Sequence, residues 1–295
     1  MTAALARVAG QLGALDDRLR RGLPGWRHRL ALIEAAELSW ISGDRISEDR
    51  LGLWISMRVT GVNTDQAGLS RASWAFRRLC EGPPPEDDLG AFLGRHDPVG
   101  DRPDIGLEGP EFESFSDRSD AWSDLMSSGA DLHPITRACM GYHSWALAGL
   151  GRLEGRVEAG VTAARIAASE CAGAVFAPIA TGGSAGLRSS GSVEARLSGW
   201  IEGMEQGIRT SMRHLDDIED WGHRAGGMMA GLSGRTPFLI RDLLIEWPVI
   251  SAPMAEEITG ASRPAVQRNL RWMEERSLIR EITGQGRFRM WRAAA

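Results

Sequence analysis

The sequence predicts a mainly α-helical protein, in which a helical body is followed by a small C-terminal domain of three helices and a β-hairpin. Two observations support this fold class. Over most of residues 1–232, apolar side chains recur every three or four residues, as at Leu12, Leu15 and Leu19. After residue 236 the helical stretches become short, and strand-like stretches follow them. We therefore expect two domains, at residues 1–232 and 236–295.

The body divides into helices at its glycine, proline and serine clusters. Gly22, Pro24 and Gly25 interrupt the first helix, and Ser47 caps a later one that runs to Met57. Further helices are expected at residues 26–41, 70–80, 134–148, 154–171 and 193–232.

Two stretches of the body lack helical periodicity. Residues 81–120 are acidic and contain scattered Gly and Pro, which predicts a long solvated loop without chemistry. Residues 173–192 are small and weakly patterned, which predicts a second loop. Its Gly182–Gly186 segment could cradle a phosphate, but a plain loop is favoured because the segment lacks a lysine and a preceding strand.

The C-terminal domain has the most readable pattern. A helix is expected from Pro237 to Trp247, a second from Pro253 to Gly260, and a third from Arg263, with Ser262 as N-cap and Pro264 in the first turn. Residues 277–283 and 287–292 read as strands around a Gly284–Gly286 turn, and the second alternates basic side chains outward with apolar ones inward. Helix, helix, turn, helix and hairpin is the order of a winged helix-turn-helix.

The third of these helices predicts contact with double-stranded DNA. If Val266, Leu270 and Met273 point inward, polar side chains cover the opposite face, namely Arg263, Gln267, Arg268 and Arg271. Arginine can bridge guanine O6 and N7, and glutamine can bridge adenine N6 and N7. Ser262 at the helix N-terminus suits a phosphate, and Arg287 and Arg289 of the wing suit phosphate or minor-groove contact. The alternative is a protein-contact domain with solvated arginines.

The charge of the chain is unevenly distributed. The net charge is −5, with a sequence pI near 5.8. Residues 235–295 hold ten arginines and seven acidic residues, a net charge of +3, which leaves −8 for residues 1–234. A basic domain on an acidic body favours DNA as the partner of that domain alone.

Composition excludes several classes of enzyme. All 34 Lys and Arg residues are arginines, and the absence of lysine excludes a Walker-type phosphate loop, a Schiff-base enzyme, a kinase and a Ser-Lys hydrolase. Cys80, Cys139 and Cys171 form no CxxC pair, so no disulfide framework or cysteine zinc site is expected. With no signal-peptide core and no run of about 18–20 apolar residues, we expect a cytoplasmic protein without membrane contact or cofactor.

Two clusters leave alternatives open. Cys139 and His143 are spaced i, i+4, and a zinc site with His133 is one alternative, although a packed Cys and a satisfied His are commoner. The second cluster lies in the helix expected at residues 193–232 and contains His214, Asp216, Asp217, Glu219 and His223. It could form a metal or acid–base site, although such residues more commonly form a solvated helix face.

Residues 200–293 resemble the C-terminal part of Fic-family proteins that carry a winged helix. The matching residues are Pro248, Val249, Pro253, Ala255, Glu256, Gly260, Ser262, Arg263 and Pro264, then Leu278, Ile279, Arg280, Glu281, Thr283 and Gly284. Residues 34–51 are similar to the inhibitory-helix region of that family, and Pro134–Ala138 with His143 to the helix before its catalytic loop. The resemblance implies a degenerate Fic-like body. The whole arrangement also resembles uncharacterised helix-turn-helix proteins of rhizobial plasmids.

The resemblance further implies that catalytic activity has been lost. Nucleotidyl transfer in this family needs a His-Pro-Phe-…-Gly-Asn-…-Arg loop, with His as base and the other groups on phosphate. After Trp145 the chain instead reads Ala-Leu-Ala-Gly-Leu-Gly-Arg-Leu-Glu-Gly-Arg, and the His133-Pro134 dipeptide stands alone. Ser42 occupies the position of the family's inhibitory Glu.

We therefore expect a sequence-specific, DNA-binding transcriptional regulator that is not an enzyme, whose body serves dimerisation or sensing. The alternatives are a divergent Fic-type nucleotidyl transferase and an antitoxin-like protein-interaction module. A homodimer is expected because one winged helix reads only a few base pairs. One apolar helix face is a candidate interface, although packing within one chain explains it equally well. It contains Trp200, Ile201, Met204, Ile208 and Met212.

Overall fold

The computed structural model describes residues 1–57, 65–95, 114–151, 156–188, 190–284 and 288–295. The body contains α1 (Thr2–Arg21), α2 (Gly25–Ser42), α3 (Glu48–Met57), α4 (Gln66–Cys80), α5 (Leu89–Leu93), α6 (Phe115–Ser127), α7 (Pro134–Ser144), α8 (Arg156–Ala167), the 3₁₀ turns η1 (Ala180–Gly182) and η2 (Ser184–Leu187), and α9 (Val193–Met229). The mainly helical prediction is confirmed. None of the helices in the described ranges combines the length and apolar character that a membrane crossing requires.

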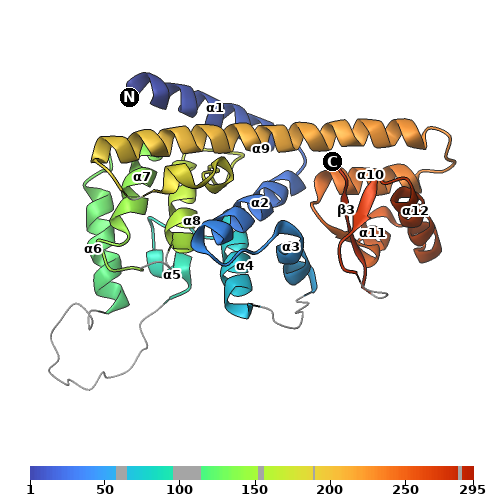
Figure 1. The fold of residues 1–295 in the computed structure, drawn as a ribbon, viewed down its shortest axis with the longest axis horizontal. Helices are drawn as coiled ribbons and strands as arrows, with labels where there is room; N and C mark the ends of the chain where they lie inside the picture. The colour runs from blue at the N-terminus through green and yellow to red at the C-terminus, as the bar shows by residue number, and fades with distance from the viewer. Residues whose placement is uncertain (58–64, 96–113, 152–155, 189, 285–287) are drawn as a thin grey trace, which may run out of the picture.

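Helix α9 runs along most of the length of the molecule and reaches both of its ends (Figure 1). The Ser192 hydroxyl caps it by accepting from Ala195 N–H at 3.2 Å. The helix then continues for 37 residues, roughly 55 Å at 1.5 Å per residue. Trp200, Ile201 and Ile208 on its apolar face are buried in the chain's own core. Packing within one chain, rather than a dimer contact, therefore accounts for this face.

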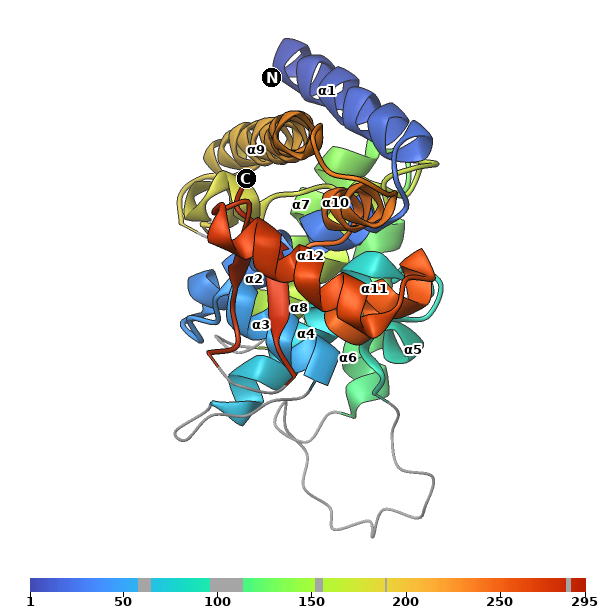
Figure 2. The same ribbon diagram turned by 90° about the vertical axis from the view of Figure 1, so that its right-hand side faces the viewer.

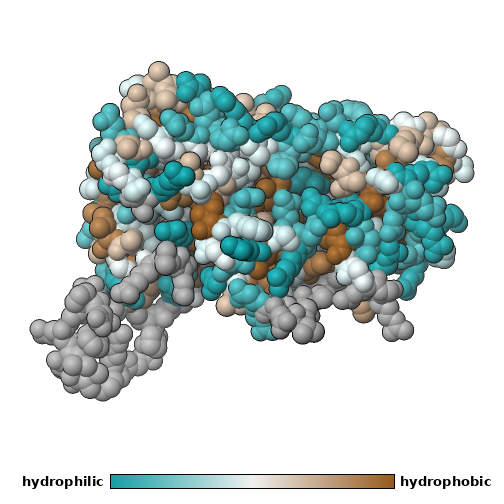
Figure 3. Space-filling view, viewed as in Figure 1, coloured by the Kyte–Doolittle hydropathy of each residue, from teal (hydrophilic) through white to brown (hydrophobic). Residues whose placement is uncertain are grey.

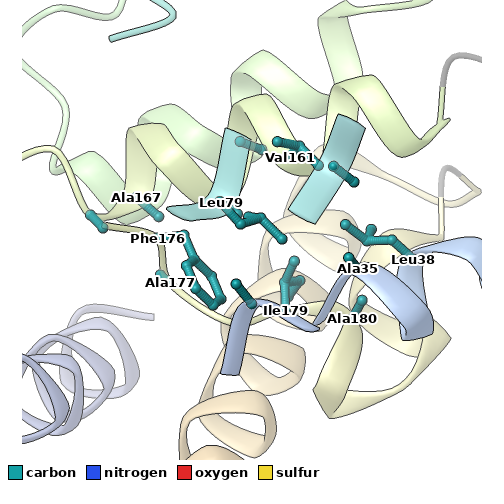
Figure 4. Packing of buried hydrophobic residues seen from close by; sticks show 14 of the residues in the cluster. Ala35, Leu38, Leu79, Val161, Ala167, Phe176, Ala177, Ile179 and Ala180 are labelled. Carbon is teal, nitrogen blue, oxygen red and sulfur yellow. The ribbon is translucent and has the colours of Figure 1, made fainter. Parts of the chain in front are cut away.

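Helices α2, α4 and α8 meet the loop after α8 in the main core of the body (Figure 4). Leu38, Leu79, Val161 and Ile179 come from these four segments and are all at most 1 % exposed. Burial of one such side chain contributes roughly 1.5–3 kcal/mol to folding. This core holds α2 at the centre of the body, where its other residues can contact the C-terminal domain.

The small-residue loop after α8 is fixed by a buried carboxylate. Glu34 of α2 is fully buried, and it accepts hydrogen bonds from the N–H groups of Ile179, Ala180 and Thr181 at 2.8–2.9 Å. The Thr181 hydroxyl donates to the same carboxylate at 2.6 Å. Because a buried carboxyl group needs hydrogen-bond partners, these contacts hold the start of η1 against α2.

The glycines of this loop pack closely against glycines of α9. A Cβ added to Gly203 of α9 would lie 2.8 Å from the Cα of Gly186, and one added to Gly182 would overlap the carbonyl oxygen of Gly203. The loop glycines are therefore required for close packing, and the phosphate-cradle alternative gains no support from the structure.

The prediction of an unbroken loop over residues 81–120 is wrong. Residues 89–93 form α5, where the Asp88 carboxylate accepts from Ala91 N–H at 2.8 Å. Helix α6 begins at Phe115 with a capping box between Ser114 and Asp117. Both helices form because local side-chain caps satisfy their first N–H groups, whereas the acidic composition alone favours a loop. Residues 96–113 of the predicted loop lie outside the described part of the chain.

The C-terminal domain lies beside the end of α9 (Figure 2), and it has its own core. It contains α10 (Thr236–Glu246), β1 (Ile250–Ser251), α11 (Ala252–Thr259), α12 (Arg263–Glu275), β2 (Ile279–Glu281) and β3 (Met290–Ala293). The strands pair antiparallel in the order β1-β3-β2. Ile218 and Trp221 of α9 belong to the same buried cluster as Val266 and Leu270 of α12. Trp221 Nε1 also donates to the carbonyl oxygen of Leu278 at 2.8 Å, so α9 joins the domain to the body.

The predicted alternation of basic and apolar residues along the last strand is wrong. Strand β3 begins only at Met290, and Phe288 is 78 % exposed with a left-handed φ of 56°. Met290 and Trp291 are both buried, at 2 % and 1 % exposure. The reason is that β3 is the central strand and is covered on both faces. Trp291 faces the C-terminal core, whereas Met290 packs into the core of the body.

Candidate nucleic-acid interface

Helix α12 is held by its apolar side chains and by the turn that precedes it. Gly260 ends α11 with a left-handed φ of 64°, and Ser262 is the N-cap of α12, as the sequence predicts. Its hydroxyl makes no capping bond to the helix. Val266, Leu270 and Met273 are 0–1 % exposed, which confirms the predicted buried stripe.

The opposite face of α12 presents basic and polar groups to solvent. Arg263, Arg268 and Arg271 are exposed, and Gln267 is half-buried. The Arg263 side chain is 79 % exposed and lies 3.9 Å from a Glu256 oxygen, a loose pair. Within the described chain, neither Arg268 nor Arg271 has a hydrogen-bond or ion-pair partner. Both guanidinium groups are therefore free to contact a ligand.

The acidic residues of α12 lie at its C-terminal end. Glu275 is exposed, and at 100° per residue it shares the outward face with Arg268 and Arg271. The neighbouring Glu274 holds Arg289 of the wing with two oxygens, at 2.7 and 2.9 Å from Nη2. Since carboxylates repel phosphate, the basic surface of the helix ends at Arg271, before this acidic end.

The wing places its predicted contact residues differently. Arg289 is only partly exposed, because it pairs with Glu274 and lies over the ring of Trp291 at 5.0 Å. The pair joins the wing to α12 and so fixes the two elements relative to each other. Arg287 lies outside the described residues. Among the residues of the wing that the structure describes, Phe288 is 78 % exposed.

The outer side of the sheet is attached to the body by an ion-pair network, the junction cluster, made of Glu48, Asp49, Arg280 and Arg292. Arg292 of β3 donates to Asp49 at 2.7 Å and to Glu48 at 3.2 Å. Arg280 of β2 donates to the other oxygen of Asp49 at 2.8 Å. Burial opposes ionisation of Arg292, but the acidic partners Asp49 and Glu48 raise its pKa. The sheet is thus bound to α3 through charge, while Met290 packs in the core of the body.

A second attachment connects α2 to the end of α10. Arg29 is 8 % exposed, and its Nη2 donates to the carbonyl oxygens of Leu244 and Trp247 at 2.7 Å and of Ile245 at 3.2 Å. These carbonyls belong to the last turn of α10, which otherwise leaves them unpaired. Burial lowers the pKa of Arg29 to about 9, and the nearby Arg292 acts in the same direction. Sequence reasoning missed both attachments, since the residues that form them lie more than 200 positions apart.

The zinc alternative of the body is not supported. His133 caps α7, and its Nδ1 accepts from Ile135 N–H at 3.2 Å. Cys139 is buried, and burial raises the pKa of its thiol to about 12. Among the residues that the structure describes, no three His, Cys, Asp or Glu side chains are placed to hold a metal ion.

The acidic cluster of α9 divides into two parts. Asp216 and Glu219 accept from Arg18 of α1 at 2.7 and 2.6 Å, so they hold α1 against α9. His214 and Asp217 face another direction and line a cavity next to the C-terminal domain. The cluster is therefore not one site.

The C-terminal domain also has the sequence features of a known family. No curated protein matches the chain. Residues 237–293 match the family described as an HTH DNA binding domain. This range covers α10, α11, α12 and the three strands, so the chain carries a C-terminal helix-turn-helix domain of a DNA-binding family.

Proposed function

We propose that the protein is a transcriptional regulator that binds double-stranded DNA in a sequence-specific manner through α12. The observation that carries this proposal is the exposed face of α12, where Arg268 and Arg271 have no partner within the described residues, in a helix-turn-helix domain. A helix of this kind fits the major groove. An arginine that is not engaged in the protein can contact guanine without first breaking an ion pair.

The other polar groups of the domain supplement this contact. We assign Gln267 and Arg268 to base reading, because they lie in the first half of α12. Ser262 and Arg263 at the helix N-terminus suit the phosphate backbone. Arg287 and Arg289 of the wing are proposed as phosphate or minor-groove contacts. For Arg289 this requires DNA to compete with Glu274 for the guanidinium.

The acidic body supports a single orientation on DNA. Residues 1–234 carry a net charge of −8 and residues 235–295 a net charge of +3. DNA repels the first and attracts the second, so the body is held away from the duplex. We propose that the functional unit is a homodimer, whose operator is an inverted repeat with half-sites about one helical turn apart.

We further propose that the body is a degenerate, catalytically inactive Fic-like unit and that the protein acts in the cytoplasm. The chain lacks the His-Pro-Phe-…-Gly-Asn-…-Arg loop that nucleotidyl transfer needs. Incubation with labelled ATP, CTP, GTP and UTP is expected to give no labelled protein. Labelling that disappears in His133→Ala or His143→Ala would favour the transferase alternative.

The experiment that tests DNA binding is selection of bound sequences from a random duplex library, followed by titration of the selected site. Arg268→Ala and Gln267→Ala are each expected to weaken binding by about 1–3 kcal/mol and to relax base preference. Arg224→Ala is the matched control for the arginine variant, because Arg224 is an exposed arginine of α9 outside the proposed surface. If no sequence is enriched, or if Arg268→Ala and Arg224→Ala behave alike, the proposed reading role of α12 is wrong.

A further inference from the structure

A cavity of about 180 Å³ lies where the body meets the C-terminal domain. We call it the junction cavity. It is lined on its polar side by Arg29 of α2, Glu48 of α3, His214 and Asp217 of α9, and Arg292 of β3. Its volume is large enough for several water molecules or a small organic molecule. Because both domains contribute to its wall, a bound molecule would contact both at once.

Three polar groups in this wall lack a partner. The Nε of Arg29 is buried and has no hydrogen-bond acceptor, although Nη2 of the same side chain is fully used by α10. His214 and Asp217 have no hydrogen bond or ion pair to any other described residue. His214 is half-buried and Asp217 is exposed, so the cost falls on the buried Nε of Arg29. Leaving a buried donor unpaired is costly, and the site therefore favours a ligand that can accept from Arg29.

The charges of the wall specify the chemistry of that ligand. Arg292 and Glu48 pair with each other at 3.2 Å, which leaves Arg29 and Asp217 as the opposite charges of the wall. Arg29 opposes a lone cation, and Asp217 opposes a lone anion. A molecule with both an anionic and a cationic group matches both charges. Apolar side chains also line the cavity, and they include Leu32, Ile33, Ile218 and Pro248.

We propose that the junction cavity binds a small zwitterion of amino-acid type with an apolar side chain. Its carboxylate pairs with Arg29 and its ammonium group with Asp217, while its side chain lies against α2 and Ile218. The cavity's small volume selects against large side chains.

The regulatory consequence of this site rests on the proposed function in DNA binding. Arg29 holds the last turn of α10, and Arg292 holds β3. A ligand that pairs with Arg29 and lies beside Arg292 therefore changes how firmly the C-terminal domain is held to the body. The C-terminal domain can be held firmly or loosely against the body. A ligand shifts the balance between these two arrangements only if it binds one of them more tightly than the other. We expect the ligand to change DNA affinity by about fivefold or more.

The test uses the full-length protein and the twenty standard L-amino acids as probes, with acetate and methylammonium as single-charge controls. Thermal unfolding identifies the binders, and calorimetry measures their affinity. At least one apolar amino acid is expected to bind, and neither single-charge control is expected to do so. Asp217→Asn should weaken binding by about tenfold or more. Asp220→Asn removes the same charge from an exposed site of α9 outside the cavity and should leave the affinity unchanged.

The site and the proposed function can fail separately. If no amino acid binds, or if Asp217→Asn and Asp220→Asn bind equally well, the junction cavity is not the site. If an amino acid binds there but leaves the affinity for the selected DNA unchanged, the regulatory role is wrong. If the protein enriches no DNA sequence, the proposed function fails, and the amino-acid titrations still decide whether the site exists.

Discussion

Arg292 of β3 and Asp49 of α3 are 243 residues apart in the sequence, and their side chains form an ion pair with an Nη1–Oδ1 distance of 2.7 Å. Each side chain is less than a third exposed. Asp49 also accepts from Arg280 of β2. One carboxylate of the body thus holds both strands of the wing, and the position of the DNA-binding domain depends on it.

Asp49→Asn is expected to lower the free energy of unfolding by about 1–3 kcal/mol, because the half-buried Arg292 loses its best charged partner. Arg280 adds little, since its side chain is 61 % exposed. Urea unfolding measures the change, with Asp131→Asn as the control at an exposed aspartate without a described partner. Equal stability of the two variants would show that the junction cluster does not hold the domain.

Glu274→Gln is expected to strengthen non-specific DNA binding. The change frees Arg289 and removes a negative charge from the end of α12. The slope of log K against log salt should become steeper by about one, as expected for one more phosphate contact. Glu257→Gln, at an exposed site on α11, removes the same charge without freeing an arginine. If the slope changes equally in both variants, the effect on DNA binding comes from net charge alone, and Arg289 gains no phosphate contact.

Helix α12 could be predicted from the sequence because its determinants are local. Pro264, Ser262 and the 3.6-residue spacing of Val266, Leu270 and Met273 all lie within one short segment. Its solvent-facing residues follow from the same spacing, although the contacts they make with DNA stay a prediction. The start of α6 also had a local signal, in Ser114 and Asp117, but the acidic composition around it favoured a loop.

The features that the sequence could not predict depend on contacts between distant segments. Met290 is buried because the body covers the outer side of the sheet, and no pattern within residues 287–292 carries that information. The same holds for the pairing of Arg29 with α10 and for the close contact between Gly186 and Gly203. Each needs two segments of the chain to be placed side by side before either residue has a role.

Gly203→Ala and Gly227→Ala are expected to have opposite effects on stability, although both lie in α9. A Cβ on Gly203 would press against Gly186, so its addition should destabilise by about 1–3 kcal/mol. At Gly227 nothing lies within 4 Å of the added Cβ. Alanine there should stabilise by about 0.5–1 kcal/mol, because it is the better helix former. Denaturant unfolding measures both, and equal effects would contradict the close packing of α9 on the loop.

Asp16 of α1 links stability to pH. Its carboxylate accepts from the backbone N–H groups of Gly173 and Ala174 at 2.6 and 2.7 Å. Burial raises the pKa of Asp16, but the hydrogen bonds outweigh it and lower the pKa below its ordinary value of 3.8. A lowered pKa in the folded state means that the unfolded chain binds the proton more readily. The stabilisation is therefore complete above about pH 4 and is lost as the pH falls through the folded-state pKa.

Asp16→Asn is consequently expected to be less stable than the unchanged protein at neutral pH, because its amide accepts these hydrogen bonds less strongly than a carboxylate does. The difference between the two proteins should shrink as the pH falls from about 4 to about 2. Urea unfolding across this range measures it, with Asp131→Asn as the control at a carboxylate without a described partner. A gap between Asp16→Asn and the unchanged protein that stays constant down to the lowest pH would mean that the charge of Asp16 does not stabilise the fold.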